Sequence, residues 1–333
     1  MNLEQTSQPH YNILTSSDDT LAPQMTISLT AMAKNLAHAH IDLYLLHSQI
    51  SPGTIKMLTD LCNGCGNITF HEIVVPDPEN YDPLVRAGRW YRETYYPLCA
   101  HQLLPDTIDR ILYLDAGDTL VVGDIAPYYN CDFDDNFLIV TPQKYKPEGD
   151  NFVLYKTDDL LPKKGYLPDI LEGIFNSGSY MINLKKMREH AINITYYLDL
   201  TEQLQKALAG PDGKKDPPVY FGDQGLLSAA FIGRIKYFGY PQIRYVWYNP
   251  FNFCIGYYRY VEQKPDYQPA ILHFAGVPFK PWKAAYPIFP ERFRQSGGDL
   301  QSLSGLKPQQ IEYYFLWLEY LFLTDKVLSL LSY

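Results

Sequence analysis

The sequence predicts an α/β protein built on a mostly parallel β-sheet with helices on its faces. Strand-like and helix-like runs alternate through the first third of the chain, which is the pattern of successive βαβ units. The run RILYL at residues 110–114 is apolar and β-favouring, as expected of a buried strand in such a sheet. With 333 residues, 46% hydrophobic and 20% charged, the chain can bury a sizeable core, which excludes a disordered or fibrous class.

The expected elements follow one another in a regular order. The early ones are a strand at 11–15, a helix at 23–36, a strand at 41–46, a helix at 51–61 and a strand at 68–75. A longer helix is expected at 83–104, leading into the strand at 110–114. Ligands of open α/β sheets bind beyond the carboxyl ends of the strands, so the residues that follow each strand are candidate site residues.

The middle of the chain is less regular. After a strand at 137–141, residues 143–170 are rich in Tyr, Asp, Lys and Pro, which indicates a long loop or a small lid. A strand at 175–184 and a helix at 185–207 follow. The composition of residues 210–218, GPDGKKDPP, is typical of a turn or linker.

The last segment, residues 311–333, carries the aromatic and leucine-rich run FLWLEYLFL. Glu319 interrupts this run, and the segment is too short and too often charged to span a bilayer. We expect it to pack on the protein's own core. A weak peripheral membrane contact or an oligomer contact through 311–333 is the alternative.

Charge and cysteine usage narrow the class of protein. The chain has 28 basic and 37 acidic residues, a net charge of −9, which argues against binding nucleic acid or an anionic membrane. Five irregularly spaced cysteines do not form the disulfide framework of a small secreted domain, so reduced thiols are expected. We interpret the isolated C-x-x-C pair, Cys62 and Cys65, as the end of a helix rather than a redox pair or half of a zinc site. Because MNLEQTSQPHY shows no export signal, we expect a cytoplasmic protein.

Residues 111–125, ILYLDAGDTLVVGDI, carry the strongest chemical signal. A buried strand ends there in two carboxylates, Asp115 and Asp118, separated by small residues. Such a pair suits a hard divalent cation, which in turn binds a pyrophosphate. The cation would supply the positive charge that a nucleotide diphosphate needs near an acidic chain. The alternative is an Asx turn that holds no metal.

The segment LYLDAGDTLVVGDI resembles the D-x-D segment of the glycosyltransferase family 8 enzymes, which use nucleotide sugars on a GT-A fold. Four further segments are similar to family motifs in the same order: ILTSSDDT, FNSGSYMINLKKMR, GDQGLL and HFAGVPFKPW. Together the five segments run from residue 13 to residue 282. The resemblance implies a GT-A domain over residues 8–285, with an acceptor lid at about 143–170, and a C-terminal helical extension over 286–333.

The resemblance also implies an activity, which is retaining transfer of a hexose from a UDP-sugar to a saccharide or glycan-like acceptor, with Mn²⁺ or Mg²⁺ as cofactor. Retaining hydrolases use a carboxylate nucleophile, and no equally clear one is offered here. We therefore favour a same-face displacement with Gln224 near the anomeric carbon and Asp223 orienting the sugar, and leave double displacement open. The alternative function is a catalytically impaired nucleotide-sugar-binding or regulatory protein on the same fold.

The family motifs assign the ligand-binding residues. The expected metal ligands are Asp115, Asp118 and His273, the last at the end of the strand-like run ILHF. Donor-binding residues come from four of the segments: Thr15, Ser17, Asp18, Asp19, Thr20, Asp115, Ala116, Asn176, Ser177, Gly276 and Lys280. Lys280 would pair with the diphosphate, and Gly276 would let the backbone approach the phosphates.

The sequence departs from the family pattern in three places. D-x-D has become D-A-G-D, with Gly117 as an inserted residue that a bulge can absorb. A family arginine that precedes the D-x-D strand falls near Pro97, and Gln143 stands where a donor-sugar carboxylate is expected. The identity of the transferred sugar therefore does not follow from the resemblance.

Overall fold

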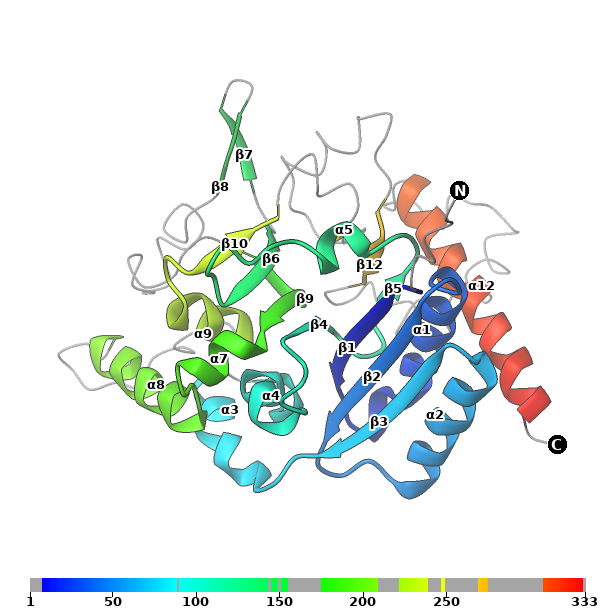
Figure 1. The fold of residues 1–333 in the computed structure, drawn as a ribbon, viewed down its shortest axis with the longest axis horizontal. Helices are drawn as coiled ribbons and strands as arrows, with labels where there is room; N and C mark the ends of the chain where they lie inside the picture. Colours follow the sequence, from blue (N-terminus) through cyan, green and yellow to red (C-terminus); the bar gives the residue numbers. More distant parts are fainter. Residues whose placement is uncertain are drawn as a thin grey trace, which may run out of the picture.

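A seven-stranded sheet forms the centre of the computed structural model, which describes residues 8–88, 90–142, 145–148, 151–154, 175–208, 222–238, 247–248, 269–274 and 308–331. The strand order is β10-β6-β9-β4-β1-β2-β3 (Figure 1). The strands span His10–Ser16 (β1), His40–His47 (β2), Ile68–Val74 (β3), Arg110–Leu114 (β4), Leu138–Pro142 (β6), Phe175–Asn183 (β9) and Ile235–Tyr237 (β10). The strands predicted from the sequence match these bounds to within one residue at each end.

Strand β9 is the exception to a parallel sheet. The pairs β1 with β2, β1 with β4, β2 with β3 and β10 with β6 are all parallel. Strand β9 is antiparallel to both of its neighbours, β4 and β6. This confirms the mostly parallel sheet, and it has a consequence for the site. The residues that begin β9 lie at the same edge of the sheet as the residues that follow β1 and β4.

Helices cover both faces of the sheet (Figure 1). One face carries α1 (Ala22–Asn35), α2 (Pro52–Cys65) and α12 (Pro308–Leu331), and the other carries α3 (Asp82–Gly88), α4 (Ala100–Leu103), α7 (Leu184–Glu189), α8 (Ile194–Leu208) and α9 (Gly222–Ala230). Successive strand residues point to opposite faces, so Ile13 belongs to the first core and Leu14 to the second. As expected, Cys62 and Cys65 lie in the last turn of α2.

The long helix expected at residues 83–104 is wrong. The chain instead forms α3, two 3-10 turns, η3 (Arg92–Thr94) and η4 (Tyr96–Cys99), and the short α4. Pro97 lies in the first turn of η4, where its missing N–H leaves no helical hydrogen bond unmade. A continuous helix through Pro97 would lose a hydrogen bond and clash with the preceding turn, so none runs through this residue, and α3 has already ended at Gly88.

The single helix expected at 185–207 is also wrong, because the chain forms the two helices α7 and α8. Between them Ala191 adopts a φ of 51°, in the left-handed region, and its N–H bonds to the carbonyl of Arg188 at 3.0 Å. The Asn193 side chain then accepts a hydrogen bond from the Tyr196 N–H at 3.0 Å, at the start of α8. These local hydrogen bonds end one helix and begin the next.

Three shorter strands form a second sheet in the order β11-β12-β5, with bounds Trp247–Tyr248, Ile271–His273 and Thr119–Val121. Strands β12 and β5 pair antiparallel, which brings two regions far apart in sequence together. In the expected lid, β7 (Tyr145–Glu148) and β8 (Asn151–Leu154) form an antiparallel pair. The rest of the 143–170 segment and all of 210–218 lie outside the described residues.

The C-terminal helix α12 packs on the protein's own core, as expected. Trp317 and Tyr320 are buried in the core that also contains α1 and α2. The Tyr320 hydroxyl accepts a 2.6 Å hydrogen bond from the amide of Asn35, and the Thr324 hydroxyl donates to the Thr30 hydroxyl at 2.9 Å. A contact of the outer face of α12 with a membrane or a second copy stays a prediction.

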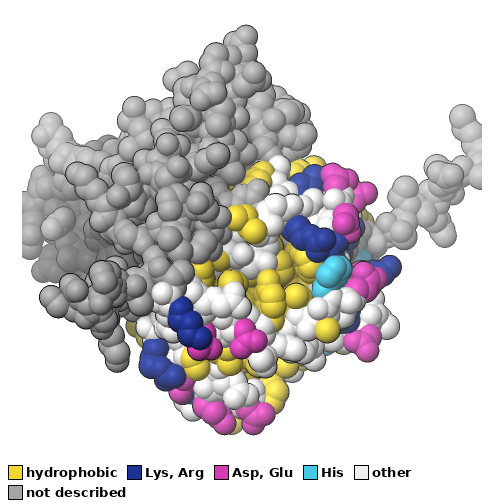
Figure 2. Space-filling view, turned by 90° about the vertical axis from the view of Figure 1, so that its left-hand side faces the viewer, with side chains coloured by type: hydrophobic (Ala, Val, Ile, Leu, Met, Phe, Trp, Pro, Cys, Tyr) yellow, Lys and Arg dark blue, Asp and Glu magenta, His cyan; other side chains and the backbone are white. Residues whose placement is uncertain are grey.

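The described surface mixes charges of both signs. Figure 2 shows the left-hand side of the molecule as drawn in Figure 1, where Lys and Arg side chains stand next to Asp and Glu in the described part. Ion pairs such as Lys236 with Asp134 contribute to this pattern.

Among the helices of the described residues, none combines the length and apolar character needed to cross a membrane.

The docking of α12 gives the first testable prediction. Replacing the buried Trp317 with Ala should lower the free energy of unfolding by about 3–5 kcal/mol, because it leaves a cavity between α12 and the core. Phe322→Ala on the same helix is the matched control, since Phe322 is 69% exposed and its loss should change stability by less than about 0.5 kcal/mol. Urea unfolding measures both variants. Equal effects would show that α12 is not anchored through Trp317.

Candidate active site

Three stretches of polar residues meet at one edge of the central sheet. Residues 17–20 follow β1, residues 115–118 follow β4, and residues 176–178 begin the antiparallel β9. The N–H of Asp115 donates a 2.9 Å hydrogen bond to the carbonyl of Gly178, which joins the second stretch to the third. The edge is therefore the place where ligands of open α/β sheets bind.

The D-A-G-D segment forms a tight turn between β4 and β5. Gly117 has a φ of 77°, and a Cβ built on it would lie 2.8 Å from the Cβ of Gln24 in α1. Position 117 therefore requires glycine for two reasons: the backbone has a positive φ, and α1 approaches closely. The Thr119 hydroxyl donates a 2.8 Å hydrogen bond to the Asp115 carbonyl and holds the turn closed. The inserted glycine is absorbed here, as expected from the sequence.

The second sheet carries His273 to the two aspartates. In the β12 and β5 pair, His273 stands opposite Thr119, and the N–H of Phe274 donates to the Asp118 carbonyl at 2.8 Å. Nε2 of His273 then lies 3.3 Å from Oδ2 of Asp115 and 3.8 Å from Oδ1 of Asp118. The three side chains can offer one donor atom each, all within 4.8 Å of one another. The fold brings together the three residues expected to hold a metal.

Gly178 makes room for the His273 ring. A Cβ built on Gly178 would lie 2.1 Å from Cε1 and 2.5 Å from Nδ1 of the imidazole, a separation that no packing tolerates. The imidazole is buried, so it has no alternative place to go without leaving the carboxylates. The sequence analysis treated Gly178 only as part of the FNSG segment. The steric need for glycine at position 178 comes from His273 on β12, and no local sequence pattern shows that β12 will lie there.

A tyrosine that the sequence analysis did not single out orients Asp115. The Tyr113 hydroxyl donates a 2.9 Å hydrogen bond to Oδ1 of Asp115. Burial first, and then the charge of Asp115, raise the pKa of Tyr113 well above its usual value, so the hydroxyl keeps the proton that it donates. The sequence spacing could have revealed this contact. Tyr113 and Asp115 are two positions apart, and residues i and i+2 of a strand point to the same face.

Asp223 is buried at the start of α9, beside the third stretch. Its Oδ1 accepts a 2.9 Å hydrogen bond from the Ser177 hydroxyl. Burial, with the nearby charge of Asp115 as the second cause, raises the pKa of Asp223 to about 8, while the Ser177 bond works in the opposite direction. The next residue, Gln224, is half-buried. Asp223 is therefore well placed to fix Ser177, whereas Gln224 is the more accessible of the pair.

Trp90 is a second residue missing from the sequence-based set. A Cβ built on Gly222 would lie 2.7 Å from Cδ1 of Trp90, so the indole packs on the first residue of α9, directly before Asp223. The Trp90 side chain is 43% exposed. An exposed ring beside a polar site is suited to stacking on a sugar face.

The loop after β1 is held by its own side chains. Asp18 accepts hydrogen bonds from the N–H and the hydroxyl of Thr20, at 2.9 and 2.6 Å. The Asp19 carboxylate accepts from the N–H of Ser51 at 3.1 Å, and this backbone hydrogen bond is the main cause that lowers its pKa. These aspartates thus have structural partners. At the end of β1, the buried Thr15 hydroxyl has no hydrogen-bond partner among the described residues.

The remaining expected site residues divide into two groups. Ala116 is buried in the turn, Ser17 is buried after β1, and Asn176 accepts a 2.9 Å hydrogen bond from the Gly178 N–H. Gly276 and Lys280 lie outside the described residues, as does Gln143. The phosphate-binding end of the expected site is therefore not described.

The donor set fits a divalent cation. Two carboxylates and one imidazole are ligands that Mn²⁺ accepts, and Mg²⁺ takes the same carboxylates. The space that Gly178 leaves for His273, and the hydrogen bond that fixes Asp115, hold two of the three ligands in place before any ion binds.

Comparison with known proteins identifies the family and the fold of the chain. The family model for "Glycosyl transferase family 8" matches residues 12–285. A lipopolysaccharide 1,2-glucosyltransferase of Escherichia coli (strain K12) is 27% identical over 208 residues, which cover 62% of this chain but only 54% of that protein. An active-site mutant of LgtC is 25% identical, with a TM-score of 0.59 and coverage of 86% of this chain and 95% of that chain.

A structure of the galactosyltransferase LgtC in complex with donor and acceptor sugar analogs is 23% identical, with a TM-score of 0.59. The similarity extends over 91% of this chain and 99% of the LgtC chain. These neighbours are GT-A proteins, which confirms the GT-A fold expected from the sequence.

The contact between Gly178 and His273 gives a prediction. Gly178→Ala should destabilise the protein by about 1–3 kcal/mol and weaken Mn²⁺ binding, because the new methyl group displaces the imidazole from Asp115 and Asp118. Urea unfolding and Mn²⁺ electron paramagnetic resonance measure the two effects. The control is Gly53→Ala in the first turn of α2, where a Cβ meets no atom within 4 Å and stability should hold or rise slightly. Unchanged Mn²⁺ affinity in Gly178→Ala would contradict the assignment of His273 to the site.

Proposed function

The chain belongs to glycosyl transferase family 8 and is a glycosyltransferase, and from this premise we propose a metal-dependent, retaining reaction. In this proposal a hexose passes from a UDP-sugar to a saccharide or glycan-like acceptor. The observation that carries it is the convergence of Asp115, Asp118 and His273, from two distant segments, at the edge of a GT-A sheet. The complex of LgtC with donor and acceptor sugar analogs supports the same pair of substrates for this chain.

The proposed cofactor is Mn²⁺ or Mg²⁺, held by Asp115, Asp118 and His273. When bound, such an ion supplies positive charge that stabilises the departing diphosphate. The protein's own part is to hold the ligands: Tyr113 fixes Asp115, and Gly178 fixes the position of the imidazole. A pre-arranged set of ligands loses little conformational freedom on binding.

The nucleotide is proposed to lie over the ends of β1 and β4. The uridine and ribose would lie among the residues at the end of β1 and in the loop after it: Thr15, Ser17, Asp18, Asp19 and Thr20. Asp115 and Ala116 would lie beside the nucleotide. The unpartnered Thr15 hydroxyl supports this arrangement, since a buried hydroxyl costs free energy until a partner such as a ligand reaches it. Beyond the described residues, Gly276 and Lys280 are assigned to the diphosphate.

The transferred sugar is proposed to lie between Asn176, Ser177 and the start of α9. Asp223 orients it through Ser177, Gln224 faces the anomeric carbon, and the exposed Trp90 ring offers a stacking surface. The bond from the anomeric carbon to the diphosphate breaks on the face where the acceptor oxygen attacks, and the acceptor's proton leaves with the diphosphate. We favour this displacement over a double displacement because Asp223, the carboxyl group nearest to Gln224 in sequence, is buried and bonded to Ser177.

Two finer points belong to the same proposal. The acceptor binds under the segment 143–170, and the free thiols of Cys62, Cys65, Cys99 and Cys131 support a reducing, cytoplasmic location. The second candidate function, a nucleotide-sugar-binding protein without turnover, rests on the inserted Gly117 and on the missing family arginine, whose expected position falls near Pro97. The turn absorbs that residue while Asp115 and Asp118 still converge, which favours the enzyme.

A thermal-shift screen tests the donor class. UDP-hexoses with Mn²⁺ should raise the melting temperature more than either component alone, because ligand and metal bind the folded state together. At about 100 times its Kd, a donor should add about 2.7 kcal/mol of stability. Shifts that do not depend on Mn²⁺ would contradict metal dependence. A joint shift with no transfer to any of a broad set of saccharides would favour the binding protein.

Substitutions of the ligands test the site. His273→Ala and Asp118→Asn should each lower kcat for hexose transfer by about 100-fold or more, since each removes a ligand of the cation that would stabilise the departing diphosphate. Asp60→Asn, a carboxylate change on the exposed side of α2, is the matched control and should leave kcat unchanged. Formation of the glycosylated acceptor and the anomeric configuration of its new bond are measured by NMR. Full activity in either ligand variant would refute the proposed site.

A further inference from the structure

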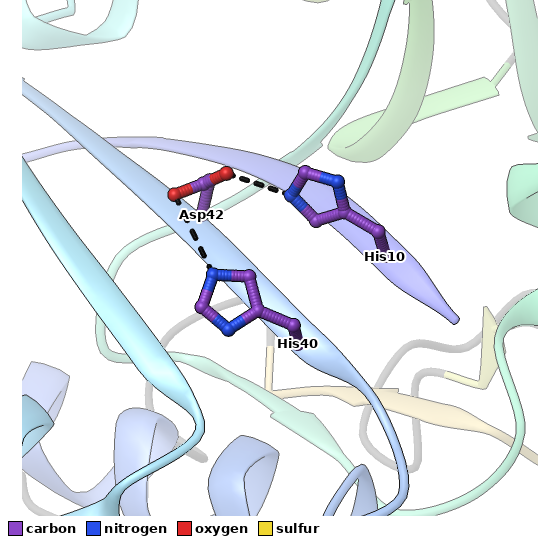
Figure 3. A group of neighbouring side chains, drawn as sticks. All are labelled: His10, His40 and Asp42. Carbon is purple, nitrogen blue, oxygen red and sulfur yellow. Dashed lines mark hydrogen bonds and ion pairs between the residues drawn. The ribbon is translucent and has the colours of Figure 1, made fainter. Parts of the chain in front are cut away.

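A second cluster of metal-binding side chains lies at the opposite end of the same strands. His10 begins β1, His40 begins β2, and Asp42 follows two residues later. Strands β1 and β2 pair in register, with His10 opposite His40, so the two imidazoles and the carboxylate project from one face of the sheet. Figure 3 shows the two rings pointing toward the Asp42 carboxylate from neighbouring strands.

The donor atoms converge closely. Nε2 of His10 lies 2.7 Å from Oδ2 of Asp42, and Nε2 of His40 lies 3.9 Å from Oδ1 of the same carboxylate. The two ring centroids are 5.4 Å apart, and one donor atom from each of the three residues lies within 4.8 Å of the others. Ligands that bind a tetrahedral zinc ion at about 2.0–2.1 Å are separated by about 3.3 Å, which falls within the observed spread.

The carboxylate is fixed by a third histidine. Nε2 of His71 on β3 lies 2.7 Å from Oδ1 of Asp42, and the His71 ring stacks on Tyr44 with centroids 4.5 Å apart. The contact with His71 therefore orients the Asp42 carboxylate. A carboxylate held by a neighbouring histidine has the outer-shell support that metal sites show.

We propose that His10, His40 and Asp42 bind a divalent transition metal, with Zn²⁺ as the ion that this donor set favours. Two imidazoles and one carboxylate are ligands of zinc, and the side chains are open enough to admit an ion, with His10 51% and His40 43% exposed. Each imidazole binds through Nε2 without its proton, so the ion replaces the hydrogen bond between His10 and Asp42 with two coordinate bonds. The fourth position is left for water or for the Thr69 hydroxyl, 3.3 Å from Nε2 of His40.

The role of this ion is structural. Strand β1 has seven residues, so its ends are about 20 Å apart at about 3.3 Å per residue. Since Asp115 and Asp118 lie beyond the other end of the strands, an ion at His10 takes no part in hexose transfer. It links β1 to β2 at their amino ends, and its binding is independent of the proposed function.

Zinc titration of the chelator-treated full chain tests the proposal. By isothermal titration calorimetry the double variant His10→Ala/His40→Ala should bind one equivalent of Zn²⁺ fewer than the wild type. Both side chains are about half exposed, so the variant should fold. The single variant His40→Gln, which keeps a polar side chain of similar reach, should weaken the same equivalent by at least about tenfold. Co²⁺ in place of Zn²⁺ should give the visible absorption of a tetrahedral site, absent from the double variant.

The matched control is His38→Ala. His38 is exposed in the turn just before β2 and is not among the three donors, so its loss should leave the zinc stoichiometry unchanged. Equal zinc binding by the wild type and the double variant would overturn the proposal, as would an equal loss in His38→Ala. The Mn²⁺-dependent transfer activity should be the same in the double variant and the wild type. A loss of transfer would overturn the separation of the two sites, whereas an inactive wild type that still binds this Zn²⁺ would refute only the proposed function.

Discussion

The arrangement of the site depends on one backbone hydrogen bond, from the N–H of Asp115 to the carbonyl of Gly178. It exists because β9 runs antiparallel to β4. A parallel strand at that position would place its carboxyl end at the edge and carry its first residues to the far side. The reversal instead brings the start of β9, with Asn176 and Ser177, beside the carboxylates that end β4. Polar groups that precede one strand thus share a site with polar groups that follow another.

Two glycines make room for the side chains of the candidate metal site. Gly178 leaves the volume that the His273 ring fills, and Gly117 lets the turn pass close to Gln24 of α1. Protein interiors are close-packed, so neither contact tolerates an added methyl group without a shift of its neighbour. The inserted residue of the D-A-G-D turn is therefore compatible with the site because it is a glycine. Any residue with a Cβ would force either α1 or the aspartates to move.

The sequence predicts the parts of this protein that depend on local pattern. Strand-like apolar runs located six of the seven central strands to within one residue at each end, all but β10, and the order of five motifs located Asp115, Asp118 and His273. It failed where local chemistry interrupts a periodic pattern, as at Pro97 and at the left-handed Ala191. It also could not reveal why Gly178 is needed, because the His273 ring that fills its space comes from β12, far along the chain. Local periodicity contains no information about which distant strands will pair.

Strands β1 and β2 keep one register along their whole length, so a change of pairing at one end would also change the pairing at the other. His10 pairs with His40, and the same register carries through to Ser16 opposite Leu46, where the loop after β1 begins. A slip by one residue would turn every side chain of β1 to the other face, which would move Ile13 from the first core toward the second and turn Thr15 away from its present position. Hydrophobic burial already opposes such a slip. A metal ion at His10, His40 and Asp42 would oppose it again at the amino ends, because its ligands come from both strands and fit only one register. An ion bound by His10, His40 and Asp42 at one end of the strands would therefore also help to keep the loop after β1 in place at the other end.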